Sequence, residues 1–266
     1  MALTDADRLQ MTALALRRIA MWKSLNYQLL LDMEGENGST TILDKVSGDA
    51  MTIYANAKLS TDAAKFGSSS MYLDGLNSYI SVPGSGASLY FGDEDFTIDC
   101  WINLVGLTSV SRMCIYAQAD AEHYKYIVYE ILNNRIGLSI YEGSNIVGWF
   151  STPLTWNNGQ WYHLATIRNG SDLALYVDGV RLTIDTGYFY HAWTNSTIPL
   201  FNTDFMIGCW VGNTRDFKGY IDYFRVVIGM ALWTENFTPP TVPSNITRPL
   251  ISTDGLPLTL AWLIKK

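Results

Sequence analysis

The residue types that most often do chemistry are few in this chain, and they do not form catalytic patterns. The three histidines, His123, His163 and His191, lie far apart and share no motif. The chain contains no Gly-x-Ser-x-Gly element and no glycine-rich loop suited to a phosphate. His163 alternates with Trp161 and Ala165, which favours packing on a strand over metal binding. These features favour a binding or display protein over an enzyme.

The cysteines give no evidence of a metal or redox site. Cys100, Cys114 and Cys209 are odd in number, and no two of them have the spacing of such a site. All three fall in apolar, strand-like runs. We therefore expect buried, reduced and separate thiols, as suits synthesis in a reducing compartment.

Asp222 stands out because of its surroundings. It lies within 218–228, a run of aromatic and β-branched residues that we expect to form a strand. A carboxylate in such a strand is costly unless it is paired or bound to a metal. An ion pair with Arg225, the capping of a loop and a metal site are all open alternatives.

Aromatic residues in loop-like stretches are candidates for stacking on sugar rings. These candidate carbohydrate-binding residues are Trp149, Trp156, Tyr188, Tyr190 and Trp193. The same side chains would also suit a protein interface or a small satellite core, and these alternatives stay open.

We expect short strands to hold these residues in place. In the stretch 96–104, apolar residues alternate with others, and the runs 161–167 and 173–177 continue the pattern. Asn169-Gly170 and Asp178-Gly179 are two-residue hairpin turn signals. Since no helical patterns alternate with the strands, we predict an all-β, antiparallel β-sandwich rather than a parallel α/β sheet.

Composition and charge limit the partners. The chain has 266 residues, 48% of them hydrophobic, enough for one large all-β domain with a sizeable core. The net charge of −7 disfavours nucleic acid, whose backbone is anionic. No apolar run is long enough to span a membrane. Charges such as Arg17 and Arg18 interrupt any signal-peptide core, so we expect cytoplasmic synthesis without a signal peptide.

Both ends of the chain differ from the middle. Residues 1–25 read as a helical arm, with a helix from about Asp5 to Lys23. Its apolar residues cover most sides of the helix, which favours self-association or attachment over the alternative of a lid on its own domain. The residues that we expect to mediate this are Leu9, Met11, Leu14, Leu16, Ile19 and Trp22. Residues 244–266 form an extended, proline-containing tail.

Seven segments, in order along the chain, resemble successive strands of laminin-G-like domains. They are Lys65–Gly75, Asn77–Pro83, Asp95–Trp101, Trp161–Ile167, Leu175–Arg181, Phe217–Arg225 and Trp233–Pro240. The resemblance implies one domain over 26–243 with the concanavalin A-like jelly-roll fold.

The subtype is similar to modules of phage structural and tail-associated proteins. The segments that carry this are Leu29–Asp32, Thr40–Asp44 and Phe237–Pro240. It implies a non-enzymatic virion protein, such as a capsid decoration, fibre or tail-associated module. Its expected partners are other virion proteins and further copies of itself, and its expected location is the virion. The alternative is a lectin that recognises host-surface glycans, and fold alone does not decide between them.

Relatives with this fold suggest two further sites. The glucanases place paired carboxylates on one strand in a Glu-x-Asp-x-x-Glu pattern, but Asp93–Asp95 and Asp99 do not have this spacing. A glycoside hydrolase is therefore the least favoured interpretation. Other relatives hold a structural calcium ion with a late-strand acid, which implies Asp222 as a ligand, with Asp44 or Glu34 supplying further oxygens. Calcium is the only cofactor that the resemblance suggests.

Overall fold

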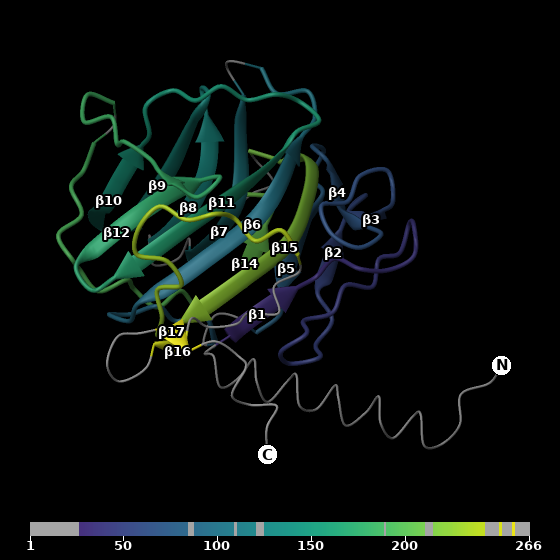
Figure 1. Ribbon diagram of the computed structural model, residues 1–266, viewed down its shortest axis with the longest axis horizontal. Coiled ribbons are helices and arrows are strands. Elements are labelled where there is room, and N and C mark those ends of the chain that lie inside the picture. Colours follow the sequence, from purple (N-terminus) through teal and green to yellow (C-terminus); the bar gives the residue numbers. More distant parts are fainter. Residues whose placement is uncertain are drawn as a thin grey trace.

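The described residues form two antiparallel sheets packed face to face (Figure 1). The computed structural model describes residues 27–84, 88–108, 111–120, 125–188, 190–210 and 215–242, with the short segments 250–251 and 257–258. The predicted all-β sandwich is confirmed over this part of the chain. The predicted N-terminal helix and most of the predicted tail lie outside the described residues.

The first sheet has eight strands. They are β1 (Tyr27–Leu31), β3 (Lys58–Ser60), β4 (Ser70–Asp74), β6 (Phe96–Leu104), β11 (Trp161–Asn169), β12 (Asp172–Val177), β13 (Val180–Arg181) and β15 (Lys218–Ile228). Their order is β13-β12-β11-β6-β15-β4-β3. The long strand β15 pairs with β6 on one edge, while β4 and β1 share its other edge.

The second sheet has seven strands. They are β2 (Thr52–Tyr54), β5 (Tyr79–Val82), β7 (Arg112–Asp120), β8 (Lys125–Leu132), β9 (Arg135–Glu142), β10 (Ser144–Phe150) and β14 (Phe205–Ile207). Their order is β10-β9-β8-β7-β14-β5-β2. Within the predicted tail, β16 (Leu250–Ile251) and β17 (Pro257–Leu258) pair with each other as an antiparallel ladder.

Alternation places one face of each strand in the core between the sheets. The inward residues of β6 are the predicted ones: Phe96, Ile98, Cys100, Ile102 and Leu104. On β8, Ile127, Tyr129 and Ile131 play the same part. All three cysteines are buried and free. Burial raises the pKa of the Cys100 and Cys114 thiols well above its usual value, which keeps these thiols protonated.

The predicted turn at Asp178-Gly179 joins β12 to β13, and both residues have positive φ, 49° and 76°. This is the geometry of a two-residue primed turn, whose twist matches that of the flanking strands. A turn that we did not predict, at Asn133-Asn134, joins β8 to β9 with φ of 50° and 62°. Asparagine tolerates this left-handed region better than most residues.

A segment that we call the strap, residues 229–240, lies across the outer face of the eight-stranded sheet. In Figure 1 it is the yellow-green trace that leaves β15 and runs back over β6, β11 and β12. Its Trp233 and Phe237 stack with ring centroids 3.9 Å apart, and the strap packs on alanines and aliphatic residues of β11 and β12. The Phe237 N–H donates to the Gly179 carbonyl at 2.9 Å. A Cβ at Gly179 would meet the Phe237 carbonyl oxygen, so the strap requires glycine there.

Beneath the strap lies a buried ion pair that joins the middle strands. Asp99 on β6 accepts hydrogen bonds from Arg225 on β15, with Nε to Oδ1 at 2.5 Å and Nη2 to Oδ2 at 2.7 Å. His163 on β11 bonds to the same carboxylate at 3.0 Å, and the Tyr27 hydroxyl on β1 contacts Arg225 at 3.3 Å. Burial alone would raise the pKa of Asp99, but Arg225 and His163 hold it below its usual value.

Asp99→Asn should destabilise the domain by about 3–5 kcal/mol, because it leaves the buried Arg225 guanidinium without its counter-charge. Equilibrium urea denaturation would measure the loss. The matched control is Asp172→Asn, which breaks an ion pair with Arg181 whose two side chains are each 46% exposed. The control should cost less than about 1 kcal/mol. Equal losses for the two variants would contradict the structural role of the buried pair.

Candidate functional site

The structure brings three of the five predicted sugar-stacking aromatics together. Trp149, Tyr190 and Trp193 line one pocket of about 380 Å³, beside β12 and β13. Trp156 and Tyr188 lie elsewhere. Trp156 donates from Nε1 to the Asn134 carbonyl, and Tyr188 packs edge-on against Phe150. The predicted set is therefore split between different places in the fold.

Much of the aromatic surface in this pocket already has protein partners. Trp193 donates from Nε1 to the Ser171 carbonyl at 3.0 Å, and the Arg168 guanidinium lies 5.2 Å from its ring centroid. Trp149 is only partly exposed and packs against the main core. Tyr190 is 46% exposed and is the most accessible of the three. These contacts agree with the alternative of a satellite core for Trp149 and Trp193.

A larger pocket, of about 580 Å³, lies on the outer face of the seven-stranded sheet, and we call it the sheet pocket. Its volume falls within the range typical of small-molecule sites. Its lining residues are Arg112, Tyr126, Val128, Glu130, Leu132, Ser139, Gly148, Phe150, Tyr190, His191, Trp210 and Arg215. The pocket is outward-facing because its β8 residues alternate with the core residues of that strand. Tyr190 lines both pockets, so the two pockets are neighbours.

The floor of the sheet pocket carries a charged cluster. Glu130, 1% exposed, accepts two hydrogen bonds from Arg112 on the neighbouring strand β7, at 2.7 and 2.9 Å. Arg215, which precedes β15, approaches both oxygens of Glu130 from Nη1 at 3.3 and 3.4 Å. A bidentate guanidinium–carboxylate pair is a strong and geometrically defined interaction. The floor is therefore polar and fixed in position.

Aromatic rings form one wall of the same pocket. Trp210 lies edge-on to Tyr126, with ring centroids 5.1 Å apart. Tyr126 stacks on Tyr141, its partner across β8 and β9, at 5.2 Å and an interplanar angle of 9°. The Arg215 guanidinium lies 4.7 Å from the Trp210 ring centroid, which links the wall to the floor.

Of the residues that line the sheet pocket, Tyr190 alone was among the predicted sugar-stacking aromatics. One signal was available: Glu130 is a lone acid within an apolar strand, which is the argument that singled out Asp222. No comparable feature of the sequence marks Arg112 or Trp210 as a pocket residue. These two side chains reach the pocket from strands and loops that meet only in the folded domain.

Asp222 caps a loop rather than pairing with Arg225. Its Oδ2 accepts hydrogen bonds from the backbone N–H groups of Lys65 and Phe66, at 2.8 and 3.0 Å. Its Oδ1 is buried and has no hydrogen-bond partner among the described residues. Burial, together with the nearby Glu34, raises the pKa of Asp222 to about 7, although hydrogen bonds from the backbone oppose the increase.

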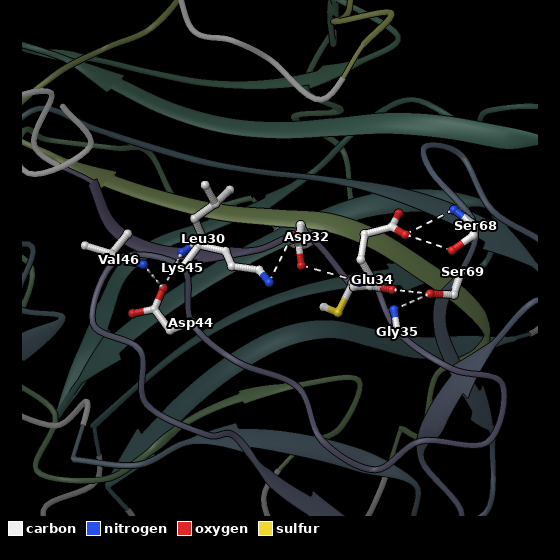
Figure 2. Close-up of polar contacts among 10 residues, drawn as sticks. Leu30, Asp32, Glu34, Gly35, Asp44, Lys45, Val46, Ser68 and Ser69 are labelled. Carbon is white, nitrogen blue, oxygen red and sulfur yellow. Dashed lines mark hydrogen bonds and ion pairs between the residues drawn. The ribbon is translucent and has the colours of Figure 1, made fainter. Parts of the chain in front are cut away.

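Of the two predicted companions, only Glu34 lies near Asp222. Glu34 accepts hydrogen bonds from the N–H and hydroxyl of Ser68, at 3.1 and 3.0 Å, in the loop that Asp222 caps. Asp44 lies apart from Glu34, beside Leu30 and Val46, as Figure 2 shows. Its oxygens accept hydrogen bonds from three backbone N–H groups, those of Leu30, Val46 and Ser47.

The donors near Asp222 fit a calcium ion in part. The unpartnered Oδ1 and the Glu34 carboxylate are oxygens of the kind that Ca²⁺ prefers. Within the described part of the chain, no three His, Cys, Asp or Glu side chains converge in a way that could hold a metal. A cation at Asp222 would therefore need backbone carbonyls or water as its remaining ligands.

The carboxylates compared with the glucanase pattern have structural partners. Asp93 accepts a hydrogen bond from the Thr197 hydroxyl, and Asp95 accepts one from the Gly170 N–H. Asp99 is the buried partner of Arg225. His163 packs on its strand, as predicted, and also bonds to Asp99.

The candidate attachment residues lie outside the described part of the chain. They are Leu9, Met11, Leu14, Leu16, Ile19 and Trp22. Among the described residues, no helix has the length and apolar character needed to cross a membrane.

With this fold and these pockets, the chain belongs to the concanavalin A-like lectin/glucanase superfamily, in its laminin-G-like branch. The family model matches residues 73–230, which include most strands of both sheets. No curated protein matches the chain.

Solved structures with the same fold include domains of sugar-acting proteins. Domain 4 of AbnA, a GH43 extracellular arabinanase from Geobacillus stearothermophilus in complex with arabinotriose, has a TM-score of 0.53 and 18% identity. That match covers 77% of this chain and 94% of that one. Trypanosoma rangeli sialidase has a TM-score of 0.54 and 14% identity, over 82% of this chain and 36% of that one. The botulinum neurotoxin serotype D binding domain has a TM-score of 0.53 and 14% identity, and the match covers 79% of this chain and 50% of that one.

Calcium should raise the melting temperature of the chelator-treated protein, because a ligand bound only by the folded state stabilises it. Asp222→Asn should abolish this response.

In chelator, the variant should also be more stable than the wild type at about pH 8, where the buried carboxylate is charged. Because the folded-state pKa of Asp222 lies above its usual value, wild-type stability falls as pH rises through this range. The advantage of the variant should therefore shrink as pH falls below about 7 and vanish below about pH 4, where Asp222 is protonated in both the folded and the unfolded chain.

Differential scanning calorimetry would measure both effects, with Asp49→Asn as a control on an exposed acid. A calcium response of equal size in Asp222→Asn and the wild type would remove Asp222 from the site. No response in the wild type would count against a calcium site altogether.

Proposed function

We propose that this domain binds saccharides in the sheet pocket and does not act on them chemically. The observation that carries the proposal is the aromatic wall of Trp210 and Tyr126, which Tyr141 supports by stacking on Tyr126, beside the charged floor of Glu130 and Arg112. A sugar ring has an apolar C–H face and a rim of hydroxyl groups. Aromatic rings with a few well-placed polar groups match both of these features.

The family and one solved relative support a saccharide as the ligand. The superfamily to which the chain belongs groups lectins with glucanases. A domain with the same fold, domain 4 of AbnA, was solved with arabinotriose. In this chain, Tyr190 lies between the sheet pocket and the smaller pocket lined by Trp149 and Trp193, since it lines both. The proposed ligand is therefore an oligosaccharide that extends from one pocket towards the other.

The carboxylates of the sheet pocket favour binding over hydrolysis. Glycoside hydrolases use two carboxylates on either side of the scissile bond. Among the described lining residues of the sheet pocket, Glu130 is the one carboxylate, and both of its oxygens bond to guanidinium groups. A turnover assay on β-glucans and arabinans checks this part of the proposal, and we expect no product.

Trp210→Ala should weaken glycan binding about tenfold or more, because it removes the ring against which the sugar would stack. A glycan array would identify the ligand, and isothermal titration calorimetry would measure the affinity. The control is Tyr54→Ala, since Tyr54 is an exposed ring that stacks on Tyr79 at the β2 edge of the sheet. Melting temperatures would show that both variants fold.

Undiminished binding by Trp210→Ala would contradict the site. If the wild type binds no glycan on the array, the proposed function itself is wrong.

A virion structural role is a second proposal, and it rests on the similarity to phage modules. In the fold, the segments that carry this similarity all serve packing: Leu29–Leu31 lies in β1, Asp44 caps its own loop and Phe237 anchors the strap. The role in a virion is inferred from the sequence similarity alone. Such a module could carry the saccharide site and attach through residues 1–24, so the two proposals are compatible.

Deletion of residues 1–24 should leave the sandwich folded and abolish self-association or particle attachment, because the strands that the structure describes begin at Tyr27. Light scattering would give the solution mass of the full and shortened chains. Circular dichroism would serve as the control for folding. A shortened chain that keeps its full assembly state would contradict the attachment role of the predicted helix.

A further inference from the structure

The charge of the sheet pocket differs in sign from that of the chain. Arg112 and Arg215 line the pocket with Glu130 as the one described carboxylate, which leaves one positive charge in excess. The chain as a whole carries −7. In the neighbouring pocket, Asp172 and Arg181 bind each other and leave no excess charge. The positive charge in the sheet pocket is therefore a local feature of this site.

The two guanidinium groups compete for a single carboxylate. Arg112 holds Glu130 with short, bidentate hydrogen bonds of 2.7 and 2.9 Å. Arg215 reaches the same oxygens only at 3.3 and 3.4 Å, although its side chain is just 23% exposed. A half-buried cation with such long contacts is incompletely neutralised, and this costs free energy.

The electrostatics of Arg215 agree with this geometry. Burial lowers the pKa of the Arg215 guanidinium, Glu130 opposes the change, and the neighbouring Arg112 lowers it further. An additional anion beside Arg215 would therefore stabilise the charged form.

Arg215 also has hydrogen-bonding capacity left for a ligand. A guanidinium has five N–H donors in a fixed plane. Among the described residues, the hydrogen bonds from Arg215 to Glu130 use Nη1. The Trp210 ring, 4.7 Å from the guanidinium, holds it beside the aromatic wall. A planar anion bound by Arg215 would thus sit next to a surface suited to a sugar ring.

We propose that the sheet pocket selects a saccharide that bears a carboxylate, and that Arg215 recognises this carboxylate while the ring of the sugar packs against Trp210. The inference rests on the proposed function, since it specifies the ligand class of the same site. Planar carboxylates match the two-pronged geometry of a guanidinium better than single hydroxyl groups do.

The test compares acidic saccharides with their neutral counterparts on the full chain. The ligands are tetragalacturonic acid and its methyl ester, and sialyllactose and lactose, so the two arms distinguish a uronic acid from a sialic acid. Titration calorimetry should show at least one acidic ligand binding about tenfold or more tighter than its neutral counterpart. The affinity for that acid should fall as sodium chloride is raised, while the affinity for the neutral ligand stays constant.

Arg215→Gln should remove the preference for the acid, because it should lower the affinity for the acidic ligand about tenfold more than the affinity for its neutral counterpart. The control is Lys58→Gln, which removes one exposed positive charge from β3 of the other sheet and should keep the preference. If Arg215→Gln does not fold, the salt dependence of the wild type still decides the question.

Equal affinity for acidic and neutral ligands would overturn the acid selectivity and leave saccharide binding in the sheet pocket intact. An acid preference that Arg215→Gln keeps would overturn the role of Arg215. A wild type that binds no saccharide of any kind would overturn the proposed function, and this inference with it.

Discussion

The ion pair between Asp99 and Arg225 constrains the arrangement of the whole eight-stranded sheet. Two opposite charges in a nearly water-free layer must stay in contact, and this fixes the register of β6 against β15. His163 and Tyr27 bond to the same pair, so β11 and β1 are positioned by it as well. The strap must cover this ion pair, because water would otherwise reach the charged side chains.

The sequence predicts the strands well because alternation is a local signal. Each residue of β6 is assigned to its face by its immediate neighbours, and the structure agrees at every position of that strand. The ion pair could not be predicted in the same way, since Asp99 and Arg225 lie 126 residues apart. The sequence offered Asp222 as a partner for Arg225. A bulge in β15 between Asp222 and Arg225 instead sets Arg225 opposite Asp99.

The candidate sites show the same limit. Aromatic residues in loops are easy to find in a sequence, but whether their rings are already packed depends on contacts such as that of Arg168 with Trp193. The sheet pocket draws its charged groups from β7, β8 and the segment before β15. Glu130 meets Arg112 and Arg215 across 18 and 85 residues of sequence. Local reasoning identifies a single acid in an apolar strand, and only the topology supplies its partners.

The position of β15 has a consequence for how the chain can acquire its fold. β15 is the last long strand in the sequence, yet it lies between β6 on one side and β4 and β1 on the other. During synthesis, β1, β4 and β6 leave the ribosome with an unfilled place between them. Unpaired strand edges of this kind invite wrong pairings until the missing strand arrives. The eight-stranded sheet therefore closes late and in one cooperative step, after almost the entire domain has been made.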